Sequence, residues 1–150
     1  SYRTSPFQGD ERIIAAATLK LEYSVRSEVR NNMRKILSSR RKKFPRKLPN
    51  CGSVFLSNPK MYDIIGPPGF AIEKVGLKGV RSGAAQISEL HANFIVNLGG
   101  AKSEDVIYLI ALARKAVYKE TGFKMDCEVR YVAEDGIISQ AHVIADKVQL

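Results

Sequence analysis

Residues 103–122 read SEDVIYLIALARKAVYKETG and contain the clearest helical pattern in the chain. Apolar residues recur there every three or four positions, which is the spacing of one face of an α-helix. These residues are Val106, Leu109, Ile110, Ala113 and Val117. Ser103 is a residue type that caps helix N-termini, and Gly122 can adopt the left-handed conformation that ends a helix. We therefore predict a helix over this stretch, with its apolar face in the core.

The residues on either side of this helix indicate β-structure. Residues 124–131 place charged residues at even positions and apolar residues at odd positions, the alternation of a half-buried strand. The pair Asp135-Gly136 favours a hairpin turn, so residues 137–144 are expected to form the partner strand. Residues 80–97 are expected to be mostly extended. The predicted fold class is α+β, with helices packed on a mixed or antiparallel sheet.

The N-terminal half is expected to contain a strand, a helix and a loop. Residues 12–23 (RIIAAATLKLEY) indicate a buried strand. Ser24 can then cap a helix that continues to about Arg41, with its apolar side on the core. That side consists of Val25, Val29, Met33, Ile36 and Leu37. Residues 58–69 are rich in proline and glycine and indicate a loop, which a short helix over residues 70–75 follows.

Composition and cysteine spacing narrow the class of protein. The chain has 150 residues, 45% of them hydrophobic and 26% charged, which is typical of a soluble globular protein. No apolar stretch approaches the roughly 20 residues of a membrane-spanning helix, and the first residues lack the hydrophobic region of a signal peptide. Cys51 and Cys127 are far apart and belong to no CxxC pair. We expect a cytoplasmic protein without a membrane segment or a metal site.

A basic block covers residues 26–47. It contains ten Lys or Arg residues against a single acid, Glu28, and so accounts for the whole net charge of +9. Such a block marks either a solvated helix face or a contact for phosphate groups. Phe44 is its only aromatic residue, so the block lacks the stacking platform that proteins use for single-stranded nucleic acid. A nucleic-acid partner is therefore not expected.

Several short motifs occur in a specific order along the chain. They are YRxS at residues 2–5, CGSVF at 51–55, GLKG at 76–79, RxGxAQIS at 81–88, HANFIVN at 91–97 and EVR at 128–130. Taken singly, each is explained as a turn, a solvated charge or a surface ion pair. Their order and spacing, however, resemble the UDP-N-acetylenolpyruvoylglucosamine reductase family. The resemblance covers nearly all of the chain.

The resemblance implies a function in the synthesis of peptidoglycan precursors. The family uses FAD and NADPH to reduce the enolpyruvyl ether of UDP-N-acetylglucosamine, giving UDP-N-acetylmuramate. By analogy, Arg3 would bind the substrate carboxylate as negative charge develops on it. Ser53 would donate a proton to the substrate, and Glu128 would act as an acid or orient the other groups. These three residues are the catalytic candidates that the resemblance implies.

Three further positions are implied to contact the UDP-sugar substrate. They are Lys43, Asn58 and His91. Asn58 lies one residue away from the family's usual spacing after the serine, and residues 61–68 lengthen the loop that follows it. The resemblance also implies that part of the basic block attracts the diphosphate of the nucleotide.

The resemblance implies two domains. Residues 1–23 would be the C-terminal end of the FAD-binding domain, and residues 24–150 would be the substrate-binding domain. Most of the flavin-binding region that precedes YRxS in the family is absent from these 150 residues. The chain alone is therefore expected to bind no FAD and to be inactive without the missing flavin domain. The alternative is a stand-alone, non-catalytic module for binding or for structure.

Overall fold

The computed structural model describes residues 5–9 and 11–150. The chain divides into two compact units, residues 1–35 and residues 36–150. In the first unit, residues 6–9 form a turn and residues 11–24 have no regular secondary structure. The helix α1 (Arg26–Lys43) begins in the first unit and ends in the second.

The strand predicted over residues 12–23 is wrong. Every side chain of this segment is exposed, including Ile13 at 92% and Leu21 at 82%. A strand satisfies its backbone N–H and C=O groups by pairing with another strand. Within the part of the chain that the structure describes, no strand pairs with this segment. Its apolar composition alone therefore does not make it a strand.

The helix predicted after Ser24 is confirmed in its extent but not in its burial. Helix α1 has 18 residues, and none of them is buried. The apolar side chains expected on the core are all exposed: Val25, Val29, Met33, Ile36 and Leu37. Helical spacing predicts which residues share a face, but it does not predict whether another element covers that face.

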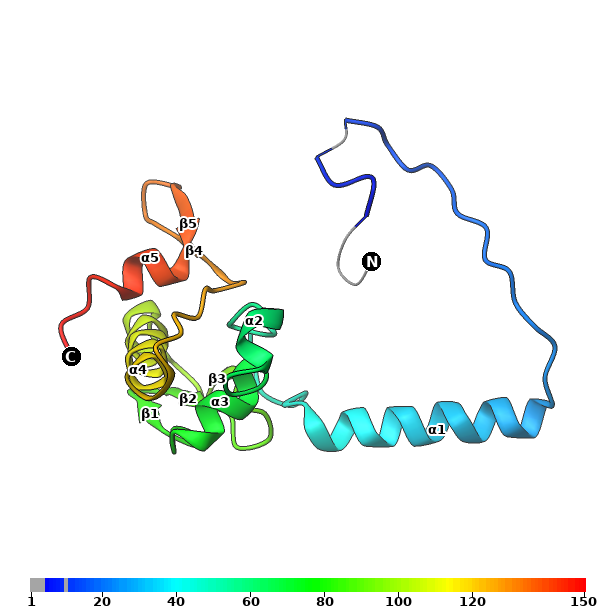
Figure 1. Cartoon of the computed structure of the whole chain (residues 1–150), viewed down its shortest axis with the longest axis horizontal. Coiled ribbons are helices and arrows are strands. Elements are labelled where there is room, and N and C mark those ends of the chain that lie inside the picture. Colours follow the sequence, from blue (N-terminus) through cyan, green and yellow to red (C-terminus); the bar gives the residue numbers. More distant parts are fainter. Residues whose placement is uncertain (1–4, 10) are drawn as a thin grey trace. The chain divides into compact units, whose positions relative to one another are not determined.

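The rest of the described chain contains helices and small antiparallel sheets, joined by loops. They are α2 (Pro59–Tyr62), α3 (Pro68–Lys74), β1 (Arg81–Ser82), β2 (Ala85–Ile87), β3 (Ile95–Asn97), α4 (Ser103–Thr121), β4 (Arg130–Val132), β5 (Ile138–Gln140) and α5 (Ala141–Ala145). β1, β2 and β3 form one sheet in that order, and β4 pairs with β5. α4 lies against β1 and β2 and beside α5 (Figure 1). The predicted α+β fold class is confirmed, with antiparallel pairing throughout these two sheets.

The predicted face of helix α4 is confirmed, whereas its predicted cap is wrong. Leu109, Ile110, Ala113 and Val117 are buried, and Val106 is partly buried. The helix ends at a glycine in the left-handed conformation, with φ of 69°. At its start, the capping position belongs to the preceding lysine, whose backbone N–H donates to the carboxylate three residues later at 3.0 Å. That carboxylate binds the Lys102 N–H, and Ser103 is the first residue inside the helix rather than its cap.

Two short helices replace predicted loop and strand. Residues 58–69 contain one helical turn, α2, and Asn58 caps it by accepting a hydrogen bond from the Lys60 N–H at 3.0 Å. A partner strand was predicted over residues 137–144, but the observed strand β5 ends at Gln140 and α5 begins at Ala141. Ala141 and Ala145 are both buried, and their spacing of four residues suits a helix face rather than a strand.

The hydrophobic core lies around α4 in the second unit. It includes Val54, Phe55, Met61, Leu109 and Cys127. The burial alternation predicted for residues 124–131 is confirmed, since the charged residues are exposed and the apolar residues are buried or partly buried. The strand predicted there is confirmed only in part, because β4 begins at Arg130 and Cys127 forms an isolated bridge with Phe55. Among residues 5–9 and 11–150, we find neither a helix able to cross a membrane nor a cluster of three potential metal ligands.

Candidate active site

Two motifs from opposite ends of the second unit lie side by side. The backbone N–H of Glu128 donates to the carbonyl of Val54 at 2.8 Å, and the N–H of Leu56 donates to the carbonyl of Asp126 at 2.8 Å. Ser53 immediately precedes this pairing and is half-buried, while Glu128 is exposed. The structure therefore brings the backbone segments that carry two predicted catalytic residues together.

Asn93 holds the other side of the CGSVF segment. It is only 6% exposed, and its side chain pairs with both backbone groups of Phe55: the N–H donates to Oδ1 at 2.9 Å and Nδ2 donates to the carbonyl at 3.0 Å. Its own carbonyl accepts the N–H of Val54 at 2.9 Å. Sequence reasoning did not single out Asn93, although it lies in the HANFIVN motif. The signal available in the sequence was an asparagine between apolar residues, because an amide buried with its neighbours needs hydrogen-bond partners.

His91 is fixed close to this segment by its ring. Nδ1 accepts the backbone N–H of Asn93 at 3.2 Å, so that nitrogen carries no proton. The ring stacks on Phe44 with centroids 5.3 Å apart, and the edge contact with Phe94 has centroids 5.1 Å apart. Burial lowers the pKa of His91, and the positive charges of Lys78 and Lys43 act in the same direction. Predicted substrate residues Lys43 and His91 thus lie within electrostatic reach of each other.

The remaining predicted residues have different settings. Asn58 is half-buried, and its amide oxygen is engaged in capping α2. Its helix, α2, follows the segment of Ser53 along the chain. Arg3 lies outside the described residues.

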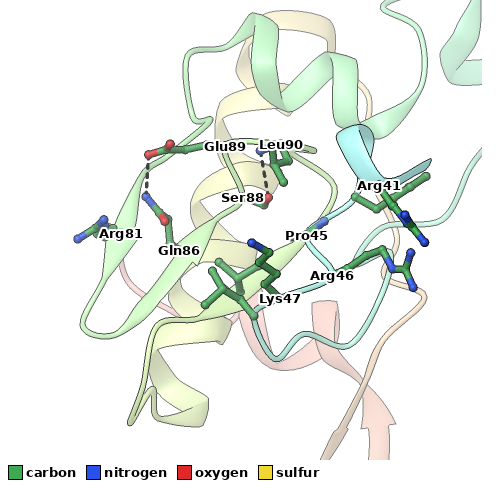
Figure 2. A pocket seen from close by; sticks show the side chains of 12 residues that line it. Arg41, Pro45, Arg46, Lys47, Arg81, Gln86, Ser88, Glu89 and Leu90 are labelled. Atoms are coloured by element: carbon green, nitrogen blue, oxygen red, sulfur yellow. Dashed lines mark hydrogen bonds between the residues drawn. The ribbon is translucent and has the colours of Figure 1, made fainter. Parts of the chain in front are cut away.

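A basic groove of about 930 Å³ adjoins the end of α1 and the β1–β2–β3 sheet (Figure 2). Its positive side chains are Arg41, Arg46, Lys47 and Arg81. Its apolar lining residues are Phe44, Pro45, Leu48, Leu90 and Val96. Charge beside apolar surface suits an anionic ligand that also carries a flat ring. Ser53 and Glu128 do not line this groove.

A comparison with protein families identifies the chain. The family model described as UDP-N-acetylenolpyruvoylglucosamine reductase, C-terminal domain, matches residues 44–132, which is more than half of the 150 residues. The chain belongs to the UDP-N-acetylenolpyruvoylglucosamine reductase family. The matched region contains CGSVF, HANFIVN and EVR, so the resemblance predicted from the motifs is confirmed.

Individual members of the reductase family agree with this assignment. UDP-N-acetylenolpyruvoylglucosamine reductase 1 of Corynebacterium glutamicum is 49% identical over 147 residues, covering 98% of this chain and 44% of that protein. The reductase of Heliobacterium modesticaldum is 39% identical over 136 residues, covering 91% and 42%. The crystal structure of the Thermus caldophilus reductase matches with a TM-score of 0.52 and 33% identity, covering 71% and 36%. The chain spans less than half the length of each of these relatives.

Helix α3 approaches His91 closely enough to give a testable prediction. A Cβ added at Gly69 would lie 2.7 Å from Cε1 of His91, inside van der Waals contact. Overpacking of this kind costs about 1–3 kcal/mol, whereas alanine is favoured over glycine in a helix by about 1 kcal/mol. The difference between these two effects predicts that Gly69→Ala lowers the free energy of unfolding by up to about 2 kcal/mol in chemical denaturation.

The partner side chain provides the matched control for Gly69. In a His91→Ala background the added methyl group meets no ring, so Gly69→Ala should be neutral or stabilising by up to about 1 kcal/mol. An equal loss of stability in both backgrounds would contradict the close contact between Gly69 and His91.

The two cysteines of this family member are expected to react differently. Burial raises the pKa of both thiols, to about 12 for Cys127, but Cys51 is exposed whereas Cys127 is only 1% exposed. Alkylation requires an accessible thiolate. At neutral pH, we expect iodoacetamide to modify Cys51 of the native chain and to modify Cys127 at least roughly a hundred-fold more slowly. Mass spectrometry of native and unfolded chains measures this.

The raised pKa of the Cys127 thiol also predicts a pH dependence of stability. Its raised pKa in the folded state means that its contribution is fully present below about pH 9 and is lost as the pH rises toward about 12. The free energy of unfolding should therefore fall more steeply over this range than in Cys127→Ala. Identical slopes, or two labels on the native chain, would contradict a protected thiol at this position.

Proposed function

We propose that the chain supplies the substrate-binding part of an FAD- and NADPH-dependent reductase acting on UDP-N-acetylglucosamine enolpyruvate. The product would be UDP-N-acetylmuramate, a peptidoglycan precursor. In this proposal residues 1–23 end the FAD-binding domain and residues 24–150 form the substrate-binding domain. The observation that carries it is the pairing of the Ser53 and Glu128 segments through the 2.8 Å bond between Glu128 N and Val54 O, in a chain of this family.

The chemistry of the reaction requires a hydride at one carbon of the enol ether and a proton at the other. When bound, FAD that NADPH has reduced supplies the hydride. A hydroxyl and a carboxyl on neighbouring segments fit the other half of the reaction, because one group can donate a proton while the other holds or polarises it. The described residues that fit this chemistry are thus proton-transfer residues, and the flavin-binding region of the relatives would hold the cofactor.

In this proposal each catalytic candidate has a distinct task. Ser53 donates the proton, and because a serine hydroxyl is a weak acid it needs a polarising neighbour. Glu128 is that neighbour or an additional acid. Arg3 binds the substrate carboxylate through the planar guanidinium, which suits a bidentate contact.

The nucleotide part of the substrate would be held near the end of α1. Lys43 would contact the nucleotide. Nδ1 of His91 already accepts the Asn93 N–H, so the ring, kept neutral by burial, would donate a hydrogen bond from Nε2 without adding charge. Asn58 would contact the substrate through its amide nitrogen, because its oxygen caps α2. Part of the basic groove would attract the diphosphate. The free thiols Cys51 and Cys127 suit a reducing cytoplasm, where we place the protein.

A chimeric enzyme tests the proposal. The chain replaces the matching 44% of the Corynebacterium glutamicum relative, so that the relative supplies the remaining flavin-binding part. We expect the chimera to bind flavin and to turn over NADPH repeatedly only when UDP-N-acetylglucosamine enolpyruvate is present. A chimera whose flavin is reduced by NADPH but is not reoxidised by this substrate would contradict the proposal and favour a non-catalytic module. The intact relative is the positive control.

A further inference from the structure

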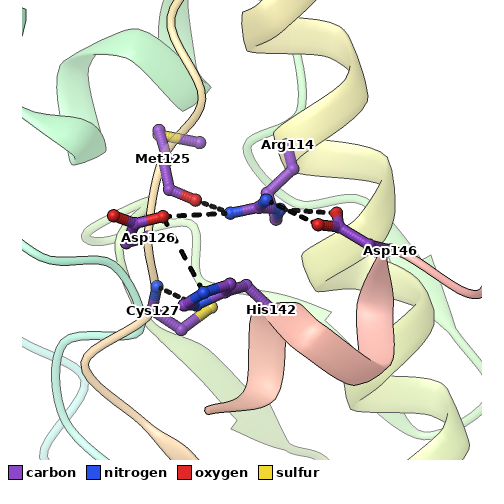
Figure 3. Close-up of polar contacts among 6 residues, drawn as sticks. All are labelled: Arg114, Met125, Asp126, Cys127, His142 and Asp146. Carbon is purple, nitrogen blue, oxygen red and sulfur yellow. Dashed lines mark hydrogen bonds and ion pairs between the residues drawn. The ribbon is translucent and has the colours of Figure 1, made fainter.

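A buried arginine connects three segments of the second unit, which are α4, the residue after α5 and residues 125–126 (Figure 3). Arg114 of α4 is only 7% exposed. Its guanidinium forms a bidentate pair with Asp146, with Nε to Oδ1 at 3.1 Å and Nη2 to Oδ2 at 3.0 Å. Nη1 donates to the carbonyl of Met125 and lies 3.8 Å from Oδ1 of Asp126. One side chain thus connects α4 and the residue after α5 to the segment that leads to Glu128.

A histidine from α5 holds the next residue of the same segment. Nδ1 of His142 accepts the backbone N–H of Cys127 at 3.0 Å, and Nε2 lies 3.8 Å from Oδ1 of Asp126. A ring nitrogen accepts a hydrogen bond only when it carries no proton. The contact therefore requires Nδ1 to be unprotonated, which leaves the proton of the neutral ring on Nε2, facing Asp126.

The backbone before Glu128 is consequently held from two sides. Arg114 and His142 bind Met125 and Cys127 from the side of α4 and α5. From the other side, the carbonyl of Val54 accepts the N–H of Glu128, and the N–H of Leu56 donates to the carbonyl of Asp126, each at 2.8 Å. Fixing Met125 and Cys127 fixes where the backbone of Glu128 meets the segment of Ser53.

We propose that Arg114 and His142 are positioning residues that set Glu128 beside Ser53 for the reduction. This inference rests on the proposed function. Neither residue needs to touch the substrate. Asp146 is exposed, and an ion pair with an exposed partner contributes little to stability, so stability alone does not explain a guanidinium here. What the network adds is direction, since it binds the carbonyl of Met125 and the N–H of Cys127.

Substituting His142 with two similar amides tests this positioning. In His142→Asn, the amide oxygen can take the place of Nδ1 and still accept the Cys127 N–H, whereas in His142→Gln the polar atoms lie at the place of Nε2. Hydrogen exchange at the Glu128 amide is measured in the 150-residue chain. We expect protection close to the parent in the Asn variant and at least roughly ten-fold faster exchange in the Gln variant. Equal protection in both variants overturns the inference.

The two His142 variants are then measured in the chimera. A displacement of about 1 Å at a catalytic group costs up to roughly a hundred-fold, so His142→Gln should slow flavin reoxidation by substrate by roughly ten- to a hundred-fold. Flavin reduction by NADPH should stay at the parent rate, and His142→Asn should recover most of the loss. A purely structural role predicts lower stability with parent-like reoxidation, which would overturn the proposal. If the parent chimera does not reduce the substrate, the proposed function fails, while the exchange result still decides whether the network positions Glu128.

Arg114 is tested against a charge-matched control on the same helix. Arg114→Met removes the contacts with Asp146 and Met125, whereas Lys119→Met removes one positive charge from the exposed end of α4. Only Arg114→Met should speed exchange at Glu128 and slow reoxidation. Parent-like behaviour of a folded Arg114→Met variant overturns its role. If this variant does not fold, Arg114→Lys replaces it, because a single ammonium cannot form the bidentate pair.

Discussion

Ser53→Ala in the chimeric reductase is expected to slow flavin reoxidation by the substrate by roughly a hundred- to ten-thousand-fold, the usual contribution of general acid catalysis. Flavin reduction by NADPH should remain close to the parent rate, because that half-reaction does not involve the enol ether. Rapid-mixing measurements follow the two half-reactions separately. A selective defect in the second one identifies Ser53 as the proton donor.

Two further variants make the Ser53 experiment specific. Ser57→Ala removes another half-buried hydroxyl from the same region and should leave both half-reactions unchanged. Ser53→Cys should recover part of the rate, because a thiol is a stronger acid than a hydroxyl. If Ser53 were a turn residue only, Ser53→Ala would change stability or affinity, and the substrate would reoxidise the flavin of this variant at close to the parent rate. That result would rule out the proton-donor role.

Asn93→Leu is expected to have the largest effect on stability among the variants of the folded chain. Phe55 is buried, and both its N–H and its carbonyl would lose their partner. Each unsatisfied buried group costs about 1–3 kcal/mol, so the free energy of unfolding should fall by about 2–6 kcal/mol in chemical denaturation. That is a large share of the stability of an ordinary domain.

Two comparison variants put the Asn93 result on a scale. Asn93→Asp keeps an acceptor for the Phe55 N–H, but it buries a carboxylate against the Phe55 carbonyl, so a loss at least as large as that of Asn93→Leu is expected. Asn58→Ala removes a single cap bond at the surface and should cost only about 1 kcal/mol. A change of less than about 1 kcal/mol in Asn93→Leu would show that this amide does not hold the CGSVF segment.

Local patterns predicted the elements whose burial follows from their own sequence. The helix at residues 103–122 and the alternation at residues 124–131 are confirmed because each presents one apolar face to the core. The same rules failed for residues 12–23 and for the apolar side of α1. In those segments burial depends on another element being present, and spacing along the chain carries no information about that element.

The sequence by itself determined the family, the α+β class and the catalytic candidates, because motif order and periodicity are properties of neighbouring residues. Only the tertiary structure decided that Asn93 bonds to both backbone groups of Phe55 and that Arg114 and His142 bind the backbone of the segment before Glu128. These contacts join segments far apart in the chain. A polar side chain fixes a backbone segment only where folding buries it opposite an N–H or C=O group that needs a hydrogen-bond partner.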